Sequence, residues 1–172
     1  MDAISEARLR LVYPPLADKV RRMAYMLEQE HIAIRVVQGL RSWPEQDALF
    51  AQGRTIPGKR VTNCPGGHSY HNFGLAVDCV PDEVWDDGKY TPDWNSAHEN
   101  WKRMEKIGES LGLENGADWR TFPDAPHFQL TGRFPIGSPT DEVRQIFKNK
   151  GMQGVWDAVS GPVPDITGEI SM

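Results

Sequence analysis

The amino-acid sequence predicts one domain of the α+β class, in which helices and short strands share a hydrophobic core. The chain has 172 residues, of which 39% are hydrophobic, so it is long enough to bury a core of its own. Some segments repeat apolar residues at helical spacing, and others are apolar runs of strand length. The sequence contains no internal repeat and no sign of a domain boundary, so we expect residues 1–172 to form a single domain.

Charge and hydropathy narrow the possible functions. The 19 basic and 24 acidic residues leave a net charge of -5, and the basic residues form no cluster, so nucleic acid is not an expected partner. The first residues lack the basic start and apolar stretch of a signal peptide, and no apolar run approaches the roughly 20 residues of a membrane span. We therefore expect a protein that is made in the cytoplasm, does not insert into a membrane and stays in the cytoplasm until it is released. We also expect a monomer.

The N-terminal part of the chain predicts two helices and a strand. A short helix should end near Tyr13, because the two prolines that follow cannot continue it. Residues 15–31 should form an amphipathic helix, whose apolar face consists of Val20, Met23, Ala24 and Leu27. Residues 32–37 then predict a strand.

A third helix should follow this strand. Ser42 and Glu45 have the spacing of a capping box, and the helix should run to Gly53. Arg41 therefore lies at a strand-to-helix junction, where side chains often serve a functional site. Residues 53–67 are rich in glycine and proline, which predicts a loop.

The segment after this loop contains His71 and Asp78, seven positions apart. On one unbroken strand these two side chains would point to opposite faces, so they could share a metal ion only if the chain turned between them. Gly74 would permit such a turn. Residues 75–80 then form an apolar run of strand length in which Asp78 is the only charge. Burying that charge is costly unless a cation or hydrogen bonds compensate it.

The next part of the chain predicts a long loop and a helix. The loop should cover residues 81–95, and the helix should be capped by Ser96 and Glu99 and end at Gly112. Its apolar face, which we expect to pack in the core, consists of Trp101, Met104, Ile107 and Leu111.

The C-terminal part predicts a loop, a strand and a last helix. The loop should span residues 113–126 and lead into a short strand at residues 127–131. The helix should cover residues 140–150, with Gly151 after its end and an irregular tail beyond. Its inward side chains should be Val143, Ile146 and Phe147.

We expect structural roles, and no metal or substrate binding, for the cysteines, three tryptophans and an acidic loop. Cys64 and Cys79 could form a disulfide, but free thiols are the better expectation in a cytosolic protein, and neither has the C-x-x-C spacing of a thiolate metal site. The acidic loop at residues 86–88 lacks the rest of an EF-hand, so calcium is not expected. We expect three tryptophans to pack or to anchor loops rather than to bind substrate; they are Trp85, Trp94 and Trp119.

Two further residues, Asp124 and His127, complete a chemical pattern. Like His71 and Asp78, they lie where a turn or loop meets a short apolar run. Histidines and carboxylates are ligands that zinc prefers, and strands often present them. The sequence therefore predicts a zinc hydrolase site.

Ordered blocks of residues between about positions 14 and 131 carry a family resemblance. They are Gln38-Gly39-Leu40-Arg41-Ser42, Gln46, Gly53-Arg54-Thr55, Pro57-Gly58, Val61-Thr62, Ser69-x-His71-x-x-Gly74-x-Ala76-x-Asp78 and Asp124-x-x-His127. Together they resemble the zinc D-Ala-D-Ala carboxypeptidases and L-alanyl-D-glutamate endopeptidases, the VanY-like peptidases. Residues 132–172, the last helix and the tail, lie outside this family-like core.

The resemblance implies a set of zinc ligands. In that family the first histidine, the aspartate of the S-x-H-x-x-G-x-A-x-D motif and the final histidine bind zinc. In this chain these positions are His71, Asp78 and His127. His68, three residues before His71, is a rival ligand that the motif places outside the set.

The resemblance also implies roles for Asp124 and Arg41. Three protein ligands leave a fourth position open, and zinc held in this way lowers the pKa of its water toward about 7 and polarises the scissile carbonyl. Asp124 would act as general base and then as general acid. Arg41 would stabilise charge on the tetrahedral oxygen or bind a substrate carboxylate, and an ordinary salt bridge is the alternative for this residue.

Asp124 departs from part of the family. Carboxypeptidase and dipeptidase members usually have a glutamate three residues before the last histidine and an aromatic residue next to it, whereas this chain has Asp124 and Pro126. The aspartate resembles the phage endolysin branch, which cuts the L-Ala-D-Glu bond of peptidoglycan stem peptides. Arg41 or Arg54 could then bind the free α-carboxylate of the γ-linked D-Glu. We therefore expect an endolysin that acts on the bacterial cell wall after release, with D-Ala-D-Ala carboxypeptidase as the alternative.

The fold implied by the resemblance is a small α+β domain whose antiparallel sheet carries the zinc site, with helices packed around it. Hedgehog signalling domains share this zinc-site architecture without an established peptidase role. A non-catalytic, zinc-containing binding domain is therefore the alternative of another class. The complete set of ligands, acid/base residue and arginine favours the enzyme.

Overall fold

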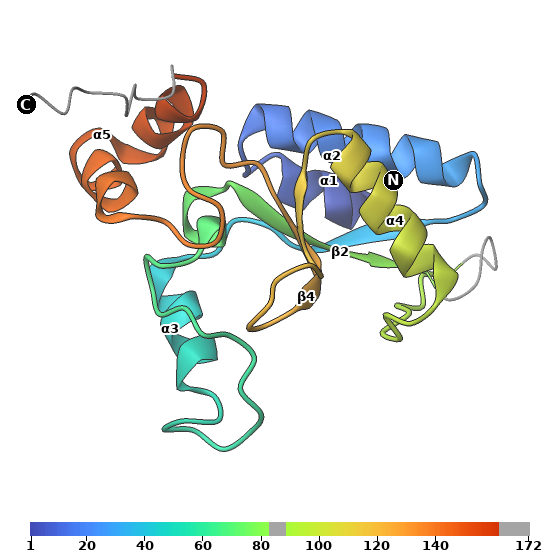
Figure 1. Ribbon diagram of the computed structural model, residues 1–172, viewed down its shortest axis with the longest axis horizontal. Helices are drawn as coiled ribbons and strands as arrows, with labels where there is room; N and C mark the ends of the chain where they lie inside the picture. The colour runs from blue at the N-terminus through green and yellow to red at the C-terminus, as the bar shows by residue number, and fades with distance from the viewer. Residues whose placement is uncertain (83–88, 162–172) are drawn as a thin grey trace, which may run out of the picture.

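A four-stranded antiparallel sheet forms the centre of the computed structural model, which describes residues 1–82 and 89–161 (Figure 1). The strand order is β1-β2-β4-β3. The strands are β1 at Ile34–Gln38, β2 at Ala76–Pro81, β3 at Glu114–Gly116 and β4 at Asp124–Gln129. The expected α+β fold with an antiparallel sheet and flanking helices is confirmed.

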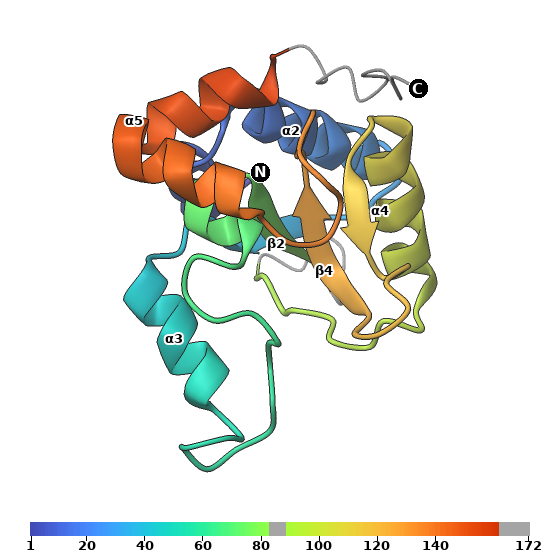
Figure 2. The ribbon, with the colours of Figure 1, turned by 60° about the vertical axis from the view of Figure 1, so that its left-hand side comes forward.

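Helices surround this sheet. In the described part of the chain they are α1 at Ala3–Leu9, α2 at Pro14–Glu28, α3 at Trp43–Ala51, the 3-10 helix η1 at Tyr70–Phe73, α4 at Glu99–Ser110 and α5 at Asp141–Val159. α2 packs against α4, and α4 contacts β2, β3 and β4. α5 instead contacts η1, and α3 extends away from the sheet (Figures 1 and 2).

The core lies between the sheet and the helices that cover one of its faces. Val77 of β2 and Phe128 of β4 are cross-strand partners, and both side chains are fully buried. A Cβ atom on Gly108 of α4 would lie 2.4 Å from the Phe128 ring, so only glycine lets the helix approach this closely. Successive side chains of a strand point to opposite faces, so Asp78 and His127 point away from this apolar layer.

Local sequence signals predicted the first three helices, with small shifts in where they begin and end. α1 ends at Leu9 rather than near Tyr13, and Tyr13 is instead the N-cap of α2, with Pro14 in the first turn. The capping box of α3 is present, because the Ser42 hydroxyl accepts from the Glu45 N–H and the Ser42 N–H donates to the Glu45 carboxylate.

The expected start of α4 is wrong. The helix begins at Glu99 with His98 at its N-cap, and no side-chain cap is formed by Ser96. The Asp93 carboxylate accepts from the Asn95 N–H and contacts His98 Nδ1 at 2.8 Å. These turn contacts hold the chain in a non-helical path up to His98, which explains the later start.

The expected loop at residues 113–126 is also wrong, because it contains the strand β3 and the start of β4. β4 begins at Asp124 and ends at Gln129, earlier than expected at both ends. β3 has only three residues, Glu114–Gly116, and gains its hydrogen bonds by pairing with β4. A strand this short and polar has no alternating apolar pattern to reveal it.

The last helix continues further than expected. Gly151 has φ 67° and ψ -165°, so it interrupts the helix as predicted, but a second helical segment follows and reaches Val159. Val155 and Val159 are buried, and Trp156 Nε1 donates to the Phe73 carbonyl at 2.9 Å. These contacts with the body of the protein stabilise the second segment.

Trp94 is 64% exposed, so it does not pack as an anchor. Trp85 and the acidic residues 86–88 lie outside the described residues. Among the helices of the described part of the chain, none has both the length and the apolar character needed to cross a membrane.

Candidate metal centre and active-site pocket

His71 is presented by η1, immediately before β2. The side-chain oxygen of Asn72 accepts from the Gly67 and Ser69 N–H groups, which closes the turn. Gly74 has φ 64° in the left-handed region, so the chain reverses there into β2, as the sequence predicted. His71 Nδ1 donates to the Gly39 carbonyl at 2.9 Å, because a carbonyl can only accept. The other ring nitrogen, Nε2, is therefore free to act as a ligand.

The fold brings together the three side chains that the sequence nominated as ligands. His71 Nε2 lies 3.1 Å from Asp78 Oδ1 and 3.2 Å from His127 Nδ1, and His127 Nδ1 lies 3.5 Å from Asp78 Oδ1. Bonds of about 2.0–2.1 Å at tetrahedral angles place two ligand atoms about 3.3 Å apart. The three observed separations bracket this value. The residues therefore fit a tetrahedral metal ion that keeps its fourth position open.

The electrostatic state of these groups matches that geometry. Burial alone would raise the pKa of Asp78, but the charges and hydrogen bonds of His71 and His127 hold it far below its usual range. For His127, burial lowers the pKa, and the contact with Asp78 outweighs this and raises it. Asp78 is therefore a carboxylate anion at any physiological pH, which is the form that can bind a metal ion. In this structure the imidazoles supply the compensation that the sequence required for a carboxylate in an apolar strand.

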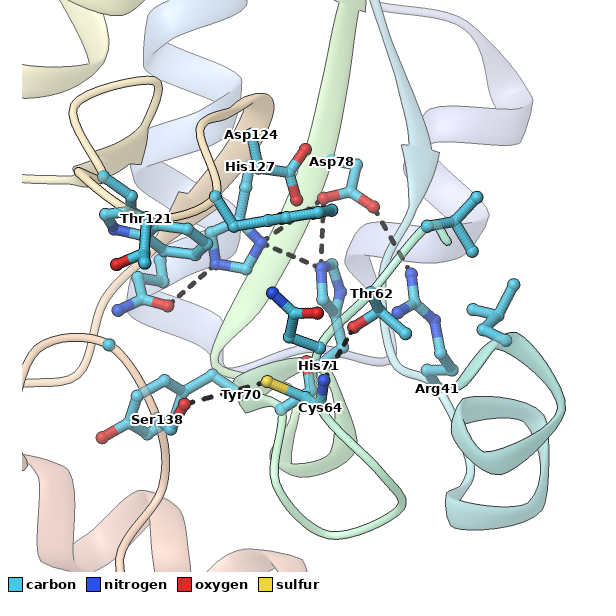
Figure 3. A pocket seen from close by; sticks show the side chains of 18 residues that line it. Arg41, Thr62, Cys64, Tyr70, His71, Asp78, Thr121, Asp124, His127 and Ser138 are labelled. Atoms are coloured by element: carbon cyan, nitrogen blue, oxygen red, sulfur yellow. Dashed lines mark hydrogen bonds and ion pairs between the residues drawn. The ribbon is translucent and has the colours of Figure 1, made fainter. Parts of the chain in front are cut away.

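Arg41 lies against the second oxygen of the same carboxylate. Its Nη2 atom is 3.4 Å from Asp78 Oδ2, and its Nη1 atom donates to Gln46 Oε1 at 2.8 Å. Gln46 is fully buried and donates onward to the Cys64 carbonyl at 2.7 Å. Asp78 thus directs one oxygen at the histidines and the other at Arg41 (Figure 3). The arginine forms the salt bridge that was its alternative role and also lines the pocket.

Asp124 is placed beside the ligands by an irregularity in the β3–β4 ladder. Asn115 pairs with Phe128, but the next residue, Gly116, pairs with Asp124. Asn115 Nδ2 donates to the carbonyls of Ala125 and His127, which ties β3 to β4 across this irregularity. Burial, together with the negative charge of Asp78, raises the pKa of Asp124. A carboxylate with a raised pKa is a stronger base, which suits proton transfer.

These residues lie in a pocket of about 480 Å³. One wall comes from α3 and the loop after it, including Thr62 and Cys64, and another from the segment between β3 and β4, including Trp119 and Phe122. Ser138 closes the rim beside Cys64, with 3.8 Å between the Cys64 sulfur and the Ser138 hydroxyl (Figure 3). The pocket is large enough for a short peptide segment.

Two nominated alternatives face elsewhere. His68 Nδ1 lies 3.3 Å from Arg144 Nη1 of α5, and His68 is not among the described residues that line the pocket. Arg54 donates to the carbonyls of Phe50 and Thr62 and does not line the pocket either. Arg54 therefore holds the loop in place, which leaves Arg41 as the pocket arginine.

Trp119 is a pocket residue that no sequence pattern indicated. It was expected to pack or to anchor a loop rather than to bind substrate; its ring centroid lies 4.8 Å from that of His127, and the side chain also lines the pocket. Both cysteines are free thiols, as expected. Burial raises the pKa of the Cys79 thiol, so it is inert, whereas Cys64 is partly exposed in the pocket.

Comparisons with known proteins agree with the resemblance. Residues 62–130 match a family described as D-alanyl-D-alanine carboxypeptidase. The peptidoglycan L-alanyl-D-glutamate endopeptidase CwlK of Bacillus subtilis (strain 168) is 39% identical over 104 residues, which are 58% of this chain and 61% of that protein. The chain thus spans about three fifths of the length of this curated relative.

Two solved structures are similar to this one. The crystal structure of the Serratia marcescens L-Ala D-Glu endopeptidase ChiX has a TM-score of 0.52 and 28% identity, covering 76% of this chain and 89% of that one. The LD-carboxypeptidase LdcB has a TM-score of 0.52 and 18% identity, covering 86% of this chain and 64% of that one, and shows the shared fold. In sequence and in fold, the chain is thus similar to VanY-like D-Ala-D-Ala carboxypeptidases and L-alanyl-D-glutamate endopeptidases.

Proposed function

We propose that this protein is a zinc-dependent peptidoglycan hydrolase that cuts the L-Ala-D-Glu bond of bacterial stem peptides. The observation that carries the proposal is the tetrahedral spacing of His71, Asp78 and His127 in an open pocket that also contains Asp124 and Arg41. CwlK and ChiX, both similar to this chain, carry the name of L-Ala-D-Glu endopeptidases. The pair Asp124 and Pro126 favours the endolysin branch, whose members reach the wall after release from the cell.

The donor set supports zinc as the metal. Two imidazole nitrogens and one carboxylate oxygen are ligands that zinc accepts, and a catalytic zinc site has three protein ligands. Zinc at this position would supply Lewis acidity for the attacking water and the scissile carbonyl. The chain itself holds the ligands in place through the Gly39 carbonyl behind His71 and the β2–β4 ladder beneath Asp78 and His127.

Asp124 moves the proton in the proposed reaction. Its carboxylate accepts a proton from the attacking water as the oxygen adds to the carbonyl carbon of L-Ala. When the C–N bond breaks, Asp124 returns this proton to the amine of D-Glu, so the group ends in its starting state. The raised pKa of Asp124 favours the first of these steps.

Arg41 binds negative charge in the substrate. Gln46 and Asp78 hold the guanidinium in one orientation, so little side-chain entropy is lost when a ligand binds. The γ-linkage of D-Glu leaves its α-carboxylate free next to the cleaved bond. A carboxylate there can form charge-assisted hydrogen bonds with Arg41, which distinguishes D-Glu from a neutral residue.

Mass spectrometry of digested, purified peptidoglycan tests the proposal. We expect stem peptides that begin with D-Glu, while L-Ala stays on the sugar strand. Activity should disappear with a chelator and return with zinc. Release of free D-Ala with the L-Ala-D-Glu bond intact would instead establish a carboxypeptidase. A zinc-loaded protein that releases no product from any wall would support the non-catalytic binding domain.

A further inference from the structure

The ring of His127 has different partners at its two nitrogens. Nδ1 faces the metal centre, 3.2 Å from His71 Nε2, whereas Nε2 lies 2.8 Å from Gln129 Oε1. His127 and Gln129 are two positions apart on β4, so their side chains share one face of the sheet. Gln129 is 1% exposed, so its amide has little access to water and depends on protein partners.

Glu114 is the partner of Gln129, so the hydrogen bonds continue from His127 through Gln129 to Glu114. It lies directly opposite Gln129 in the β3–β4 pairing, and its Oε2 atom accepts from Gln129 Nε2 at 2.6 Å. Its other oxygen, Oε1, accepts from Trp119 Nε1 at 3.1 Å. Both oxygens of Glu114 are therefore used, one toward the metal ligand and one toward the aromatic wall of the pocket.

The carboxylate of Glu114 sets the direction of the hydrogen bonds that link Glu114, Gln129 and His127. A carboxylate only accepts, so Gln129 must turn its NH2 group toward Glu114 and its carbonyl oxygen toward His127. That oxygen also only accepts, so the proton of a neutral His127 must be on Nε2. The lone pair of Nδ1 then points at the metal centre. Without the carboxylate, the amide of Gln129 could rotate by half a turn and reverse the assignment.

We propose that Glu114 is a positioning residue that sets the tautomer of His127 through Gln129, so that Nδ1 is the metal-binding nitrogen. The proposal rests on the proposed metal site, but not on which peptide bond is cut. His71 needs no such device, because its Nδ1 donates to the backbone carbonyl of Gly39, which cannot reverse. Since Trp119 shares the carboxylate, Glu114 also ties one pocket wall to the metal centre.

The tautomer can be measured directly in the zinc-loaded wild-type protein, because zinc is diamagnetic. Two-bond 1H–15N correlation spectra distinguish the two tautomers of an assigned histidine. We expect His127 to carry its proton on Nε2. A proton on Nδ1 would overturn the proposal, and this result needs no variant and no substrate.

Exchange of the two side chains provides a second test. In Glu114→Gln, the new amide can satisfy Trp119 with its oxygen only by turning its NH2 group to Gln129, which reverses Gln129 and moves the His127 proton to Nδ1. In Gln129→Glu, two carboxylates face each other. We expect each single variant to bind zinc about 10- to 100-fold more weakly, as for other partners of ligating histidines.

The double variant Glu114→Gln/Gln129→Glu should regain wild-type zinc affinity to within a few fold. The new carboxylate at position 129 would then accept from both His127 Nε2 and the new amide at position 114, and that amide would accept from Trp119, so every group is satisfied again. A merely structural role of the pair predicts that two substitutions are worse than one. Failure of the double variant to exceed both single variants in zinc affinity would therefore contradict the proposal.

Asp157→Asn is the matched control. Asp157 accepts from Gln153 Nε2 at 2.7 Å in an exposed pair on α5, and it is not among the described residues that line the pocket. We expect this variant to bind zinc like the wild type in a competition assay with a chromophoric chelator. Equal zinc affinities for Asp157→Asn and Glu114→Gln, with an unchanged His127 tautomer, would overturn the proposal. Because neither measurement uses peptidoglycan, a failure of the proposed peptidase activity would be recognised separately.

Discussion

Asp78 and His127 are cross-strand partners in the β2–β4 ladder, and Asp78 Oδ1 lies 3.5 Å from His127 Nδ1. Directly opposed residues of an antiparallel pair have their side chains on the same face and close together. The sheet therefore holds two of the three candidate ligands, and η1 adds His71 from the side. A site built in this way is preorganised before any metal binds.

The metal ligands can be tested by removing one of them. The wild-type chain should bind one zinc ion, and His71→Ala should weaken zinc binding by more than about 100-fold, because loss of a ligand should exceed loss of a partner behind it. Equilibrium dialysis followed by elemental analysis measures this. His68→Ala is the matched control, since His68 faces Arg144, and it should retain zinc. The opposite pattern would make His68 the ligand.

Asp124→Asn should separate catalysis from metal binding. The amide preserves the shape of the side chain but cannot accept a proton, so we expect kcat to fall by about 10²- to 10⁴-fold with unchanged zinc content. Initial rates on a defined stem peptide provide the measurement. Asp118→Asn, at an exposed position between β3 and β4, should be as active as the wild type. Nearly normal turnover of Asp124→Asn would exclude Asp124 as the base.

Arg41→Lys should change the preference for the substrate carboxylate. Lysine keeps the charge but loses the planar pair of donors, so we expect kcat/KM on a D-Glu peptide to fall by roughly 10- to 100-fold. A peptide with D-isoglutamine, whose α-carboxyl group is an amide, should be much less affected. Arg54→Lys serves as the control and should leave the ratio between the two substrates unchanged. Equal losses on both peptides for Arg41→Lys would assign Arg41 to the tetrahedral oxygen instead.

Gly74→Ala should weaken both the fold and the metal centre. Its positive φ costs an L-residue about 1–2 kcal/mol, and a Cβ there would lie 3.3 Å from Trp156 and from the Val12 backbone. Gly151 also has a positive φ, but a Cβ there would meet nothing within 4 Å. Both alanine variants should unfold more easily in urea, whereas only Gly74→Ala should lose zinc affinity. Equal zinc affinities would show that the turn tolerates displacement.

Stability at acidic pH should depend on Asp2, the N-cap of α1. Burial raises the pKa of Asp2, but its bonds with the Ser5 N–H and hydroxyl and its pair with Arg35 outweigh this and hold it below the ordinary value of 3.8. A carboxyl group with a lowered pKa stabilises the folded state while it is ionised. This contribution is fully present above pH 3.8 and is lost as the pH falls through the lower pKa of the folded state.

Asp2→Asn removes this charge while keeping a cap. In the metal-free protein we expect its free energy of unfolding to be about 0.5–1 kcal/mol below that of the wild type near neutral pH. The difference should shrink below pH 3.8, where the wild-type carboxyl group also becomes neutral. Urea titrations at several pH values measure both quantities. A difference that stays constant down to the lowest pH would contradict the electrostatic explanation.

Several features of this protein can be read from the chain itself, because their causes are local. The capping box of Ser42 and Glu45 and the turn at Gly74 depend on residues only a few positions apart, and both are present. The candidate ligands His71, Asp78 and His127 were nominated by motif resemblance, and the fold brings them together. The carboxylate in an apolar strand also indicated a compensating partner, and the two imidazoles supply it.

Other features arise from contacts between residues remote in sequence. The three residues of β3, none of them with an apolar side chain, form a strand only because they pair with the edge of β4, and that pairing sets Glu114 opposite Gln129. The same segment brings Trp119 to the pocket, which no local pattern indicated. Strand register is set by the partner strand and by the packing on each face, since one residue of slip would turn every side chain to the other side. The candidate ligands could therefore be named from the sequence, whereas their contacts with Gln129 and Glu114 emerged only when the strands were paired.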